Sequence, residues 1–266
     1  MHTSKETALK DTQSERDHRG IAIDRVGIKD LKYPMRVREK HGPGQETVAN
    51  LTLTVDLPHD FKGTHMSRFV EALSAGGFEL SPSSIKGILP NLMERLDSER
   101  AHVDVEFPFF IKKAAPVTAA EGLVDYLVRF NATGEGREVD LVTTVVVNVT
   151  TLCPCSKAIS AYGAHNQRGQ VTFAVRTSEF VWIEDLIAIV ERSASSELYS
   201  LLKRPDEKFV TERAYDNPKF VEDIARDVAL RLNADDRIGR YRVEVENFES
   251  IHNHNAYAEI VGTGAE

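Results

Sequence analysis

The sequence predicts an α+β protein in which antiparallel sheets carry helices on one face. Three observations support this class: segments in which every second residue is apolar, segments with apolar residues at helical spacing, and an order of segments that repeats between the two halves of the chain. An alternating strand buries one of its faces. Helices with a single apolar stripe supply the layer that covers it.

The first half predicts strand, strand, helix, helix, strand and strand, at 21–37, 51–57, 66–73, 85–96, 103–107 and 124–130. Ser83 or Ser84 is the expected N-cap of the second helix, since a serine side chain accepts a hydrogen bond from the first helical turn. Pro90 within this helix predicts a kink or a late start.

The second half predicts the same order, at 138–151, 170–177, 183–192, 217–232, 241–248 and 256–261. Asn217 and Pro218 begin the last helix as N-cap and first helical residue. The duplication rests on element order alone, because no sequence repeat is found. We expect two modules, 21–135 and 136–266, after a polar segment 1–20 that lacks the apolar residues to fold.

Composition and charge restrict the classes of function that the chain can have. Of the 266 residues 41% are apolar and 28% are charged, and the net charge is −8, which does not favour nonspecific binding to nucleic acid or membrane surfaces. No apolar run reaches the roughly 20 residues that span a bilayer, and no signal peptide is found. With only Cys153 and Cys155, too close for a relaxed disulfide, the chain is expected to be cytoplasmic with free thiols.

Both cysteines belong to the segment 152–157, Leu-Cys-Pro-Cys-Ser-Lys, which follows a strand rich in β-branched residues. Residues i and i+2 of an extended chain point to the same side, so the sulfurs of Cys153 and Cys155 are expected to face one pocket. Thiolates there would bind zinc or a similar ion, or act as nucleophiles. The alternative is a pair of small buried side chains at a strand end.

Other polar residues of the second half have similar chemical capacity. His165 follows Cys153 by 12 residues, in a turn bounded by glycines, and Glu207 belongs to a charged segment that resembles a loop. The segment 249–254, Glu-Ser-Ile-His-Asn-His, follows a strand, and a histidine such as His252 transfers protons near neutral pH. Taken singly, each is equally explained as an exposed surface residue.

One segment of the first half suits an anionic ligand. Lys62, His65, Ser67 and Arg68 surround a predicted helix N-terminus, where backbone N–H groups and the helix dipole favour phosphate. The glycine patterns of P-loops and of dinucleotide-binding folds are missing from any supporting context, so neither nucleotide fold is predicted.

Together these segments resemble the type IB GTP cyclohydrolases. The matching pieces are 63–68 (Gly-Thr-His-Met-Ser-Arg), 152–157, 162–168 (Tyr-Gly-Ala-His-Asn-Gln-Arg), 203–208 (Lys-Arg-Pro-Asp-Glu-Lys) and 249–254. They run through most of the chain after its first 20 residues. The cysteine segment with the histidine turn that follows it is the most specific part.

The resemblance implies a tunnelling fold, in which two tandem strand-strand-helix-helix-strand-strand modules per chain assemble into barrels across subunits. It implies a homotetramer with active sites between subunits, GTP as the small-molecule substrate, and neither nucleic acid nor membrane as a partner. The implied reaction converts GTP and water into 7,8-dihydroneopterin triphosphate and formate, the first step of tetrahydrofolate biosynthesis. It needs one divalent metal ion per site, zinc, manganese or iron, to activate the water that attacks guanine C8.

The resemblance also implies roles for individual residues. The metal ligands are Cys153, His165 and Glu207, the catalytic groups are Cys153, Cys155, Glu249 and His252, and the substrate-binding groups are Glu222, His65, Arg68, Lys157 and Arg168. Which cysteine binds the metal and which assists catalysis stays open. Glu222 would anchor the guanine base, although its position equally suits an acid that the helix dipole favours.

Three alternatives stay open. Another tunnelling-fold cyclohydrolase would release a cyclic phosphate, and a nitrile-forming reductase of this fold would consume NADPH. A non-catalytic, metal-binding oligomeric scaffold would keep its metal and turn over no GTP.

Overall fold

One large sheet organises the molecule. The computed structural model describes residues 11–75 and 79–264, and within them ten strands pair in the order β10-β9-β7-β6-β5-β4-β2-β1-β3, with β8 beside β6. The strands are β1 Ile23–Val37, β2 Gln45–Leu57, β3 Glu79–Leu80, β4 Arg100–Ala114, β5 Glu121–Glu135, β6 Glu138–Leu152, β7 Asn166–Thr177, β8 Ser196–Glu197, β9 Ile238–Phe248 and β10 Ala256–Thr263. All neighbours are antiparallel except β3, which runs parallel to β1.

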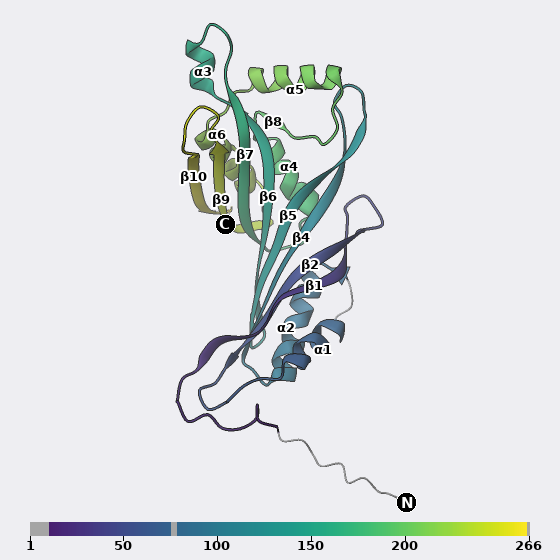
Figure 1. Cartoon of the computed structure of the whole chain (residues 1–266), viewed down its shortest axis with the longest axis vertical. Coiled ribbons are helices and arrows are strands. Elements are labelled where there is room, and N and C mark those ends of the chain that lie inside the picture. Colours follow the sequence, from purple (N-terminus) through teal and green to yellow (C-terminus); the bar gives the residue numbers. More distant parts are fainter. Residues whose placement is uncertain (1–10, 76–78, 265–266) are drawn as a thin grey trace, which may run out of the picture.

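Helices cover one face of this sheet (Figure 1). The helices are α1 Met66–Ala75, α2 Pro82–Leu96, α3 Pro154–Ile159, α4 Ile183–Glu191, α5 Arg204–Asp216 and α6 Val221–Asn233. Helix α3 buries no residue and projects past the end of β6 instead of covering the sheet. Buried side chains of α1, α2, α4 and α6 pack on the inward residues of the strands, such as Phe107, Phe130 and Phe173. The predicted α+β class, with an antiparallel sheet and helices on one face, is confirmed.

The two halves share the sheet. Strands β5 and β6 pair from Leu127 opposite Val146 to Glu135 opposite Glu138, and a two-residue turn joins them. Gly136 in this turn has φ +58, a left-handed conformation that glycine adopts without strain. The predicted boundary between 135 and 136 therefore falls in a hairpin turn, and backbone hydrogen bonds join the halves.

Helix α2 begins earlier than predicted. Its N-cap is Ser81, whose hydroxyl accepts from the Ser84 N–H at 3.1 Å while the Ser84 hydroxyl accepts from the Ser81 N–H at 2.9 Å. Because this capping box starts the helix at Pro82, the predicted N-cap at Ser83 or Ser84 is wrong. The helix continues through Pro90, which faces solvent, so the predicted late start is also wrong.

Helix α6 begins later than predicted, at Val221 with Phe220 as N-cap. Asn217 is not the N-cap, because its side-chain amide instead donates to the backbone carbonyl of Ala194 at 2.9 Å. Two helices, α3 and α5, occupy segments for which an extended chain and a loop were predicted.

Residues 11–20 lie along the loop between β2 and α1. The Asp17 N–H donates to the Asp60 carbonyl at 2.9 Å, and the Lys62 N–H donates to the Glu15 carbonyl at 3.2 Å. This part of the segment 1–20, which was expected to lack fixed structure, therefore has defined backbone contacts; residues 1–10 lie outside the described part of the chain. Within the described ranges, no helix is both long enough and apolar enough to cross a bilayer.

Candidate active site

The predicted catalytic segments meet at one end of the sheet, where β6 ends, β7 begins and β9 ends. Leu152, the last residue of β6, lies opposite Asn166, the first of β7, and Arg168 on β7 lies opposite Phe248, the last of β9. Segments that extend past this edge are neighbours because the strands are antiparallel and in register. The structure thus brings Cys153, His165 and Glu249 together, although the first and the last are 96 positions apart in the sequence.

Cys153 is the N-cap of the short helix α3. Its N–H donates to the His165 carbonyl at 3.1 Å, and its sulfur accepts from the Ser156 N–H at 3.4 Å. The sulfur therefore lies at the positive end of a helical turn, where negative charge is favoured. Cys153 is half-buried, whereas Cys155 is exposed.

The two sulfurs do not lie on one side of an extended chain, so this prediction is wrong. Pro154 and Cys155 are the first two residues of α3, and helical side chains are rotated by about 100° from one residue to the next. The periodicity of the strand ends at Leu152, because Pro154 favours the first position of a helix. The two cysteines consequently have different surroundings.

His165 and Glu249 are each held by a neighbouring side chain. His165 Nδ1 lies 3.0 Å from Ser250 Oγ, and the His165 N–H donates to Ser156 Oγ at 3.2 Å. Glu249 Oε1 accepts from Gln167 Nε2 at 3.2 Å. His165, Glu249 and Gln167 are all half-buried, so these hydrogen bonds restrain their side chains while solvent can still reach them.

His252 lies on the same turn as Glu249 but is exposed. Its ring stacks on that of His254, with centroids 5.1 Å apart and planes 16° apart. The two histidines therefore form a pair at the rim of the site.

Three further predicted residues lie around this end of the sheet. The Lys219 N–H donates to the Leu152 carbonyl at 3.1 Å, which brings the start of α6, with the exposed Glu222, beside Cys153. Arg168 is exposed on β7. Lys157 is already engaged, because its ammonium donates to the Tyr215 carbonyl and lies 4.2 Å from the centre of the Tyr215 ring.

Glu207 lies apart from the other predicted metal ligands. It is exposed in the first turn of α5, not in a loop, and the rise of a helix puts it about 12 Å along the axis from Tyr215, the end that contacts Lys157. Among residues 11–75 and 79–264, no group of three or more His, Cys, Asp and Glu side chains is arranged to hold a metal ion. Within one chain, Cys153 and His165 therefore lie at the same site, whereas Glu207 lies away from it.

The phosphate-binding residues predicted in the first half are also distant from Cys153. Helix α1 lies toward the opposite end of the long axis from α3 (Figure 1). His65 Nε2 lies 3.3 Å from Asp11 Oδ2, and the Arg68 guanidinium donates to the Arg95 carbonyl at 3.0 Å. Within one chain they do not join the cysteine site.

The N-terminus of α5 is fixed by Asp206, which is fully buried. Its carboxylate accepts from the Val117 and Thr118 N–H groups, each at 2.8 Å, and from the Thr118 hydroxyl at 2.6 Å. Burial raises the pKa of Asp206, but the hydrogen bonds from Thr118, Lys203 and Val117 outweigh it and hold that pKa well below its usual value. Helix α5 is thus tied at one end to the β4–β5 turn and at the other to Lys157.

A buried ion network lies beneath α5. Lys113 on β4 donates to Glu191 at 2.8 Å and also contacts Glu197 on β8, and the Tyr126 and Tyr199 hydroxyls donate to the two carboxylates at 2.6 and 2.8 Å. Burial raises the pKa of Tyr126, as do the charge of Glu191 and its hydrogen bond. Burial would also raise the pKa of Glu197, yet the bond and charge of Lys113 hold it below its usual value.

A row of polar residues beneath the site was not predicted from the sequence. Thr151, Gln167 and Asn247 have buried side-chain oxygens without a hydrogen-bond partner among the described residues. Thr151 and Asn247 flank Gly169, where an added Cβ would lie 2.9 Å from both side chains. Each of the two takes the next inward position after a run of buried valines, so a polar residue that continues an apolar alternation was the available signal.

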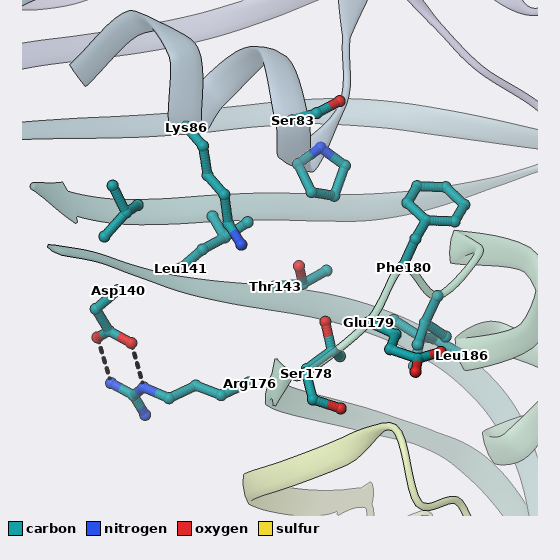
Figure 2. Close-up of a pocket in the computed structure, with 14 residues that line it drawn as sticks. Ser83, Lys86, Asp140, Leu141, Thr143, Arg176, Ser178, Glu179, Phe180 and Leu186 are labelled. Atoms are coloured by element: carbon teal, nitrogen blue, oxygen red, sulfur yellow. Dashed lines mark hydrogen bonds and ion pairs between the residues drawn. The ribbon is translucent and has the colours of Figure 1, made fainter. Parts of the chain in front are cut away.

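A separate cavity of about 280 Å³ lies between the start of α2, strands β6 and β7, and the segment after β7. Figure 2 shows Lys86 reaching from α2 toward Leu141, and the bidentate pair of Arg176 with Asp140, at 2.7 and 2.8 Å. None of the predicted catalytic or metal-binding residues lines it.

Comparison of the sequence with known proteins agrees with the motifs. A family model described as type I GTP cyclohydrolase folE2 matches residues 9–258. A GTP cyclohydrolase FolE2 from Nitrosococcus oceani is 56% identical over 255 residues, which cover 96% of each chain. Another from Akkermansia muciniphila is 59% identical over 255 residues, covering 95% of this chain and 97% of that protein.

Comparison of the structure gives the fold. Uricase from Arthrobacter globiformis matches with a TM-score of 0.53 at 10% identity, covering 91% of this chain and 93% of that one. A hyperthermostable mutant of Bacillus sp. TB-90 urate oxidase matches with a TM-score of 0.54 at 8% identity, covering 91% and 98%. At such low identity this likeness shows the fold alone. The sequence match is what shows the family: the chain belongs to the type I GTP cyclohydrolase folE2 family.

Proposed function

We propose that this protein is a GTP cyclohydrolase that converts GTP and water into 7,8-dihydroneopterin triphosphate and formate, at the start of tetrahydrofolate biosynthesis. The observation that carries the proposal is the meeting of Cys153, His165 and Glu249 at one end of the sheet, in a chain 56% identical to a GTP cyclohydrolase FolE2 along almost its whole length. We place the reaction in the cytoplasm, where two unpaired cysteines stay reduced.

One divalent metal ion is part of this proposal. Cys153 and His165 fit such an ion, because a thiolate and an imidazole suit zinc, manganese or iron to different degrees, and because the contact of His165 Nδ1 with Ser250 leaves Nε2 for a ligand. Glu207 is the proposed third ligand. When bound, the ion would supply Lewis acidity and an activated water for attack on guanine C8.

The other residues have roles in binding and proton transfer. Glu249, which Gln167 holds by one oxygen, and His252 on the same turn are the proposed acid-base groups for opening and reclosing the ring. Cys155, exposed in the first turn of α3, is the proposed second sulfur that assists them. Glu222 would accept hydrogen bonds from the guanine base.

We propose that a second copy of the chain completes each site. The support is that Glu207 lies in the first turn of α5, whose other end contacts Lys157, and that α1, which holds Arg68, lies toward the opposite end of the molecule from α3 (Figure 1). Strand β10 also stands at the edge of the sheet and pairs only with β9 among the described strands, and the free backbone groups of such an edge can pair with a strand of another subunit. Two tandem tunnelling-fold modules that close into barrels in a homotetramer would satisfy both observations, with Arg68, His65, Arg168 and Lys157 near the triphosphate.

The first experiment measures formate release and pterin fluorescence after oxidation, with GTP as substrate. We expect both, with a linear triphosphate product, and we expect a chelator to abolish them and added divalent metal to restore them. Full activity in metal-free protein would contradict the metal assignment. A cyclic phosphate product, NADPH consumption, or metal binding without GTP turnover would each support one of the three alternatives instead.

Mixing two inactive variants tests the shared site. Cys153→Ala and Glu207→Ala proteins are expected to be inactive alone. If Glu207 enters the site of a neighbouring copy, random mixed oligomers regain roughly a quarter of wild-type activity, since that fraction of sites receives both intact residues. If both residues act from one chain, mixing restores nothing, which would contradict the proposal.

A further inference from the structure

Two side-chain contacts connect the start of β7, and His165 just before it, to the turn after β9. His165 Nδ1 lies 3.0 Å from Ser250 Oγ, and Gln167 Nε2 donates to Glu249 Oε1 at 3.2 Å. Two consecutive residues of one turn thus contact residues i and i+2 of the neighbouring segment. Together the two contacts hold the side chains of His165 and Glu249 in a fixed position relative to each other.

The first contact decides which nitrogen of His165 is available. A neutral imidazole carries one proton, and the nitrogen without it binds a metal ion. If Nδ1 carries the proton and donates a hydrogen bond to Ser250 Oγ, the lone pair of Nε2 is left to bind a metal ion. A hydrogen bond of this kind orients a ligating histidine and raises its basicity.

The second contact decides which oxygen of Glu249 is available. Gln167 occupies Oε1, and among the described residues Glu249 Oε2 has no hydrogen-bond partner. Gln167 is itself half-buried, opposite Thr151 on β6, and its own Oε1 is buried with no partner in the part of the chain that the structure describes. A buried amide oxygen of this kind commonly binds an ordered water, which would further restrict the side chain.

We propose that Ser250 and Gln167 are positioning residues for the reaction. Ser250 holds His165 with Nε2 directed to the metal, and Gln167 holds Glu249 with Oε2 directed to the substrate. This inference rests on the proposed function, because it assigns partners to the metal-binding and acid-base groups of the same site.

Metal affinity tests the role of Ser250 independently of turnover. Metal-free protein is titrated with zinc in competition with a chromophoric chelator. Ser250→Ala is expected to weaken zinc binding by about 10- to 100-fold, the usual effect of removing the partner of a ligating histidine, and Ser250→Thr, which keeps the hydroxyl, is expected to restore it. Ser160→Ala is the matched control, since it removes a hydroxyl that accepts from the Tyr162 N–H at 3.1 Å near α3.

Kinetics test the role of Gln167. Gln167→Met keeps the length of the side chain but removes its N–H donor, so kcat is expected to fall by about tenfold or more while KM changes little, because a displaced acid-base group slows the chemical step rather than binding. The matched control is Gln170→Met, on the same strand, whose amide donates to Asn148 at 3.1 Å. Thermal unfolding of each variant shows whether a loss reflects folding.

The outcomes separate this inference from the function itself. Wild-type zinc affinity in Ser250→Ala, or wild-type kcat in Gln167→Met, would overturn it while GTP turnover by the unaltered protein stands. The proposed function would be overturned if the wild-type protein releases no formate. The role of Ser250 would still stand if Ser250→Ala weakens the zinc affinity of that protein. A wild-type protein that releases formate but binds no metal ion would overturn the metal assignment and the role of Ser250, and would leave the function standing.

Discussion

Replacing Lys113 with methionine removes the only charged donor that contacts both Glu191 and Glu197 in the described structure. The Lys113 side chain is 10% exposed, and those of Glu191 and Glu197 are 14% and 20% exposed, so water screens these charges little. Breaking a buried ion pair by removing one partner costs about 3–5 kcal/mol. Because Tyr126, Tyr199 and Arg213 still contact the carboxylates, we expect the lower end, about 3 kcal/mol.

Urea unfolding followed by circular dichroism measures this cost, and thermal unfolding should show a fall in Tm of about 6–12 °C for a chain of this size. Lys112→Met is the matched control. The neighbouring Lys112 pairs with Glu121 at 2.5 Å, but both side chains are more than half exposed, so its loss should cost less than about 1 kcal/mol. Equal costs for the two variants would refute the argument that burial makes the Lys113 network important.

Three further predictions follow from the same structure. Because the folded-state pKa of Glu197 is depressed, its contribution is present above its ordinary value of 4.5 and lost as the pH falls, so the stability difference between wild type and Lys113→Met should shrink below pH 4.5 in unfolding titrations. Gly169→Ala should lower the free energy of unfolding by about 1–3 kcal/mol, since its Cβ would overlap Thr151 and Asn247; unchanged stability would contradict the close approach. Cys153→Ser should lose zinc affinity while Cys155→Ser keeps it and loses kcat, and the reverse pattern would exchange the proposed roles of the two sulfurs.

Much of the fold was predictable because it depends on apolar periodicity. The alternation of Val171, Phe173 and Val175 correctly predicts a strand over 170–177, since these residues are buried and their neighbours are not. The start of β7 was not predicted, because the strand begins at Asn166, in a segment expected to be a turn. Helix α5 could not be found in this way. Its buried residues are Asp206 and Ala214, and hydrogen bonds at its two ends fix its position instead of an apolar stripe. Contacts of that kind depend on tertiary structure and leave no periodic signal.

The site was predictable to a similar extent. The motifs identified Cys153, His165 and Glu249, and the register of β6, β7 and β9 brings them together. The partners Ser250 and Gln167 were inside quoted motifs but received no role, because only the register shows which side chains face each other. The place of Glu207 could not be predicted from the sequence of one chain if a second copy receives it.

The hairpin between β5 and β6 bears on how this chain would behave if it were cut. Separation of the chain at Gly136 would leave α1 and α2 with one fragment and α3 to α6 with the other, and would unpair β5 from Leu127 to Glu135 and β6 from Glu138 to Val146. Unpaired edges of this length recruit a matching strand. Two halves expressed from separate genes should therefore associate through these strands. The fold should tolerate new chain termini at this turn, provided that the two halves stay paired.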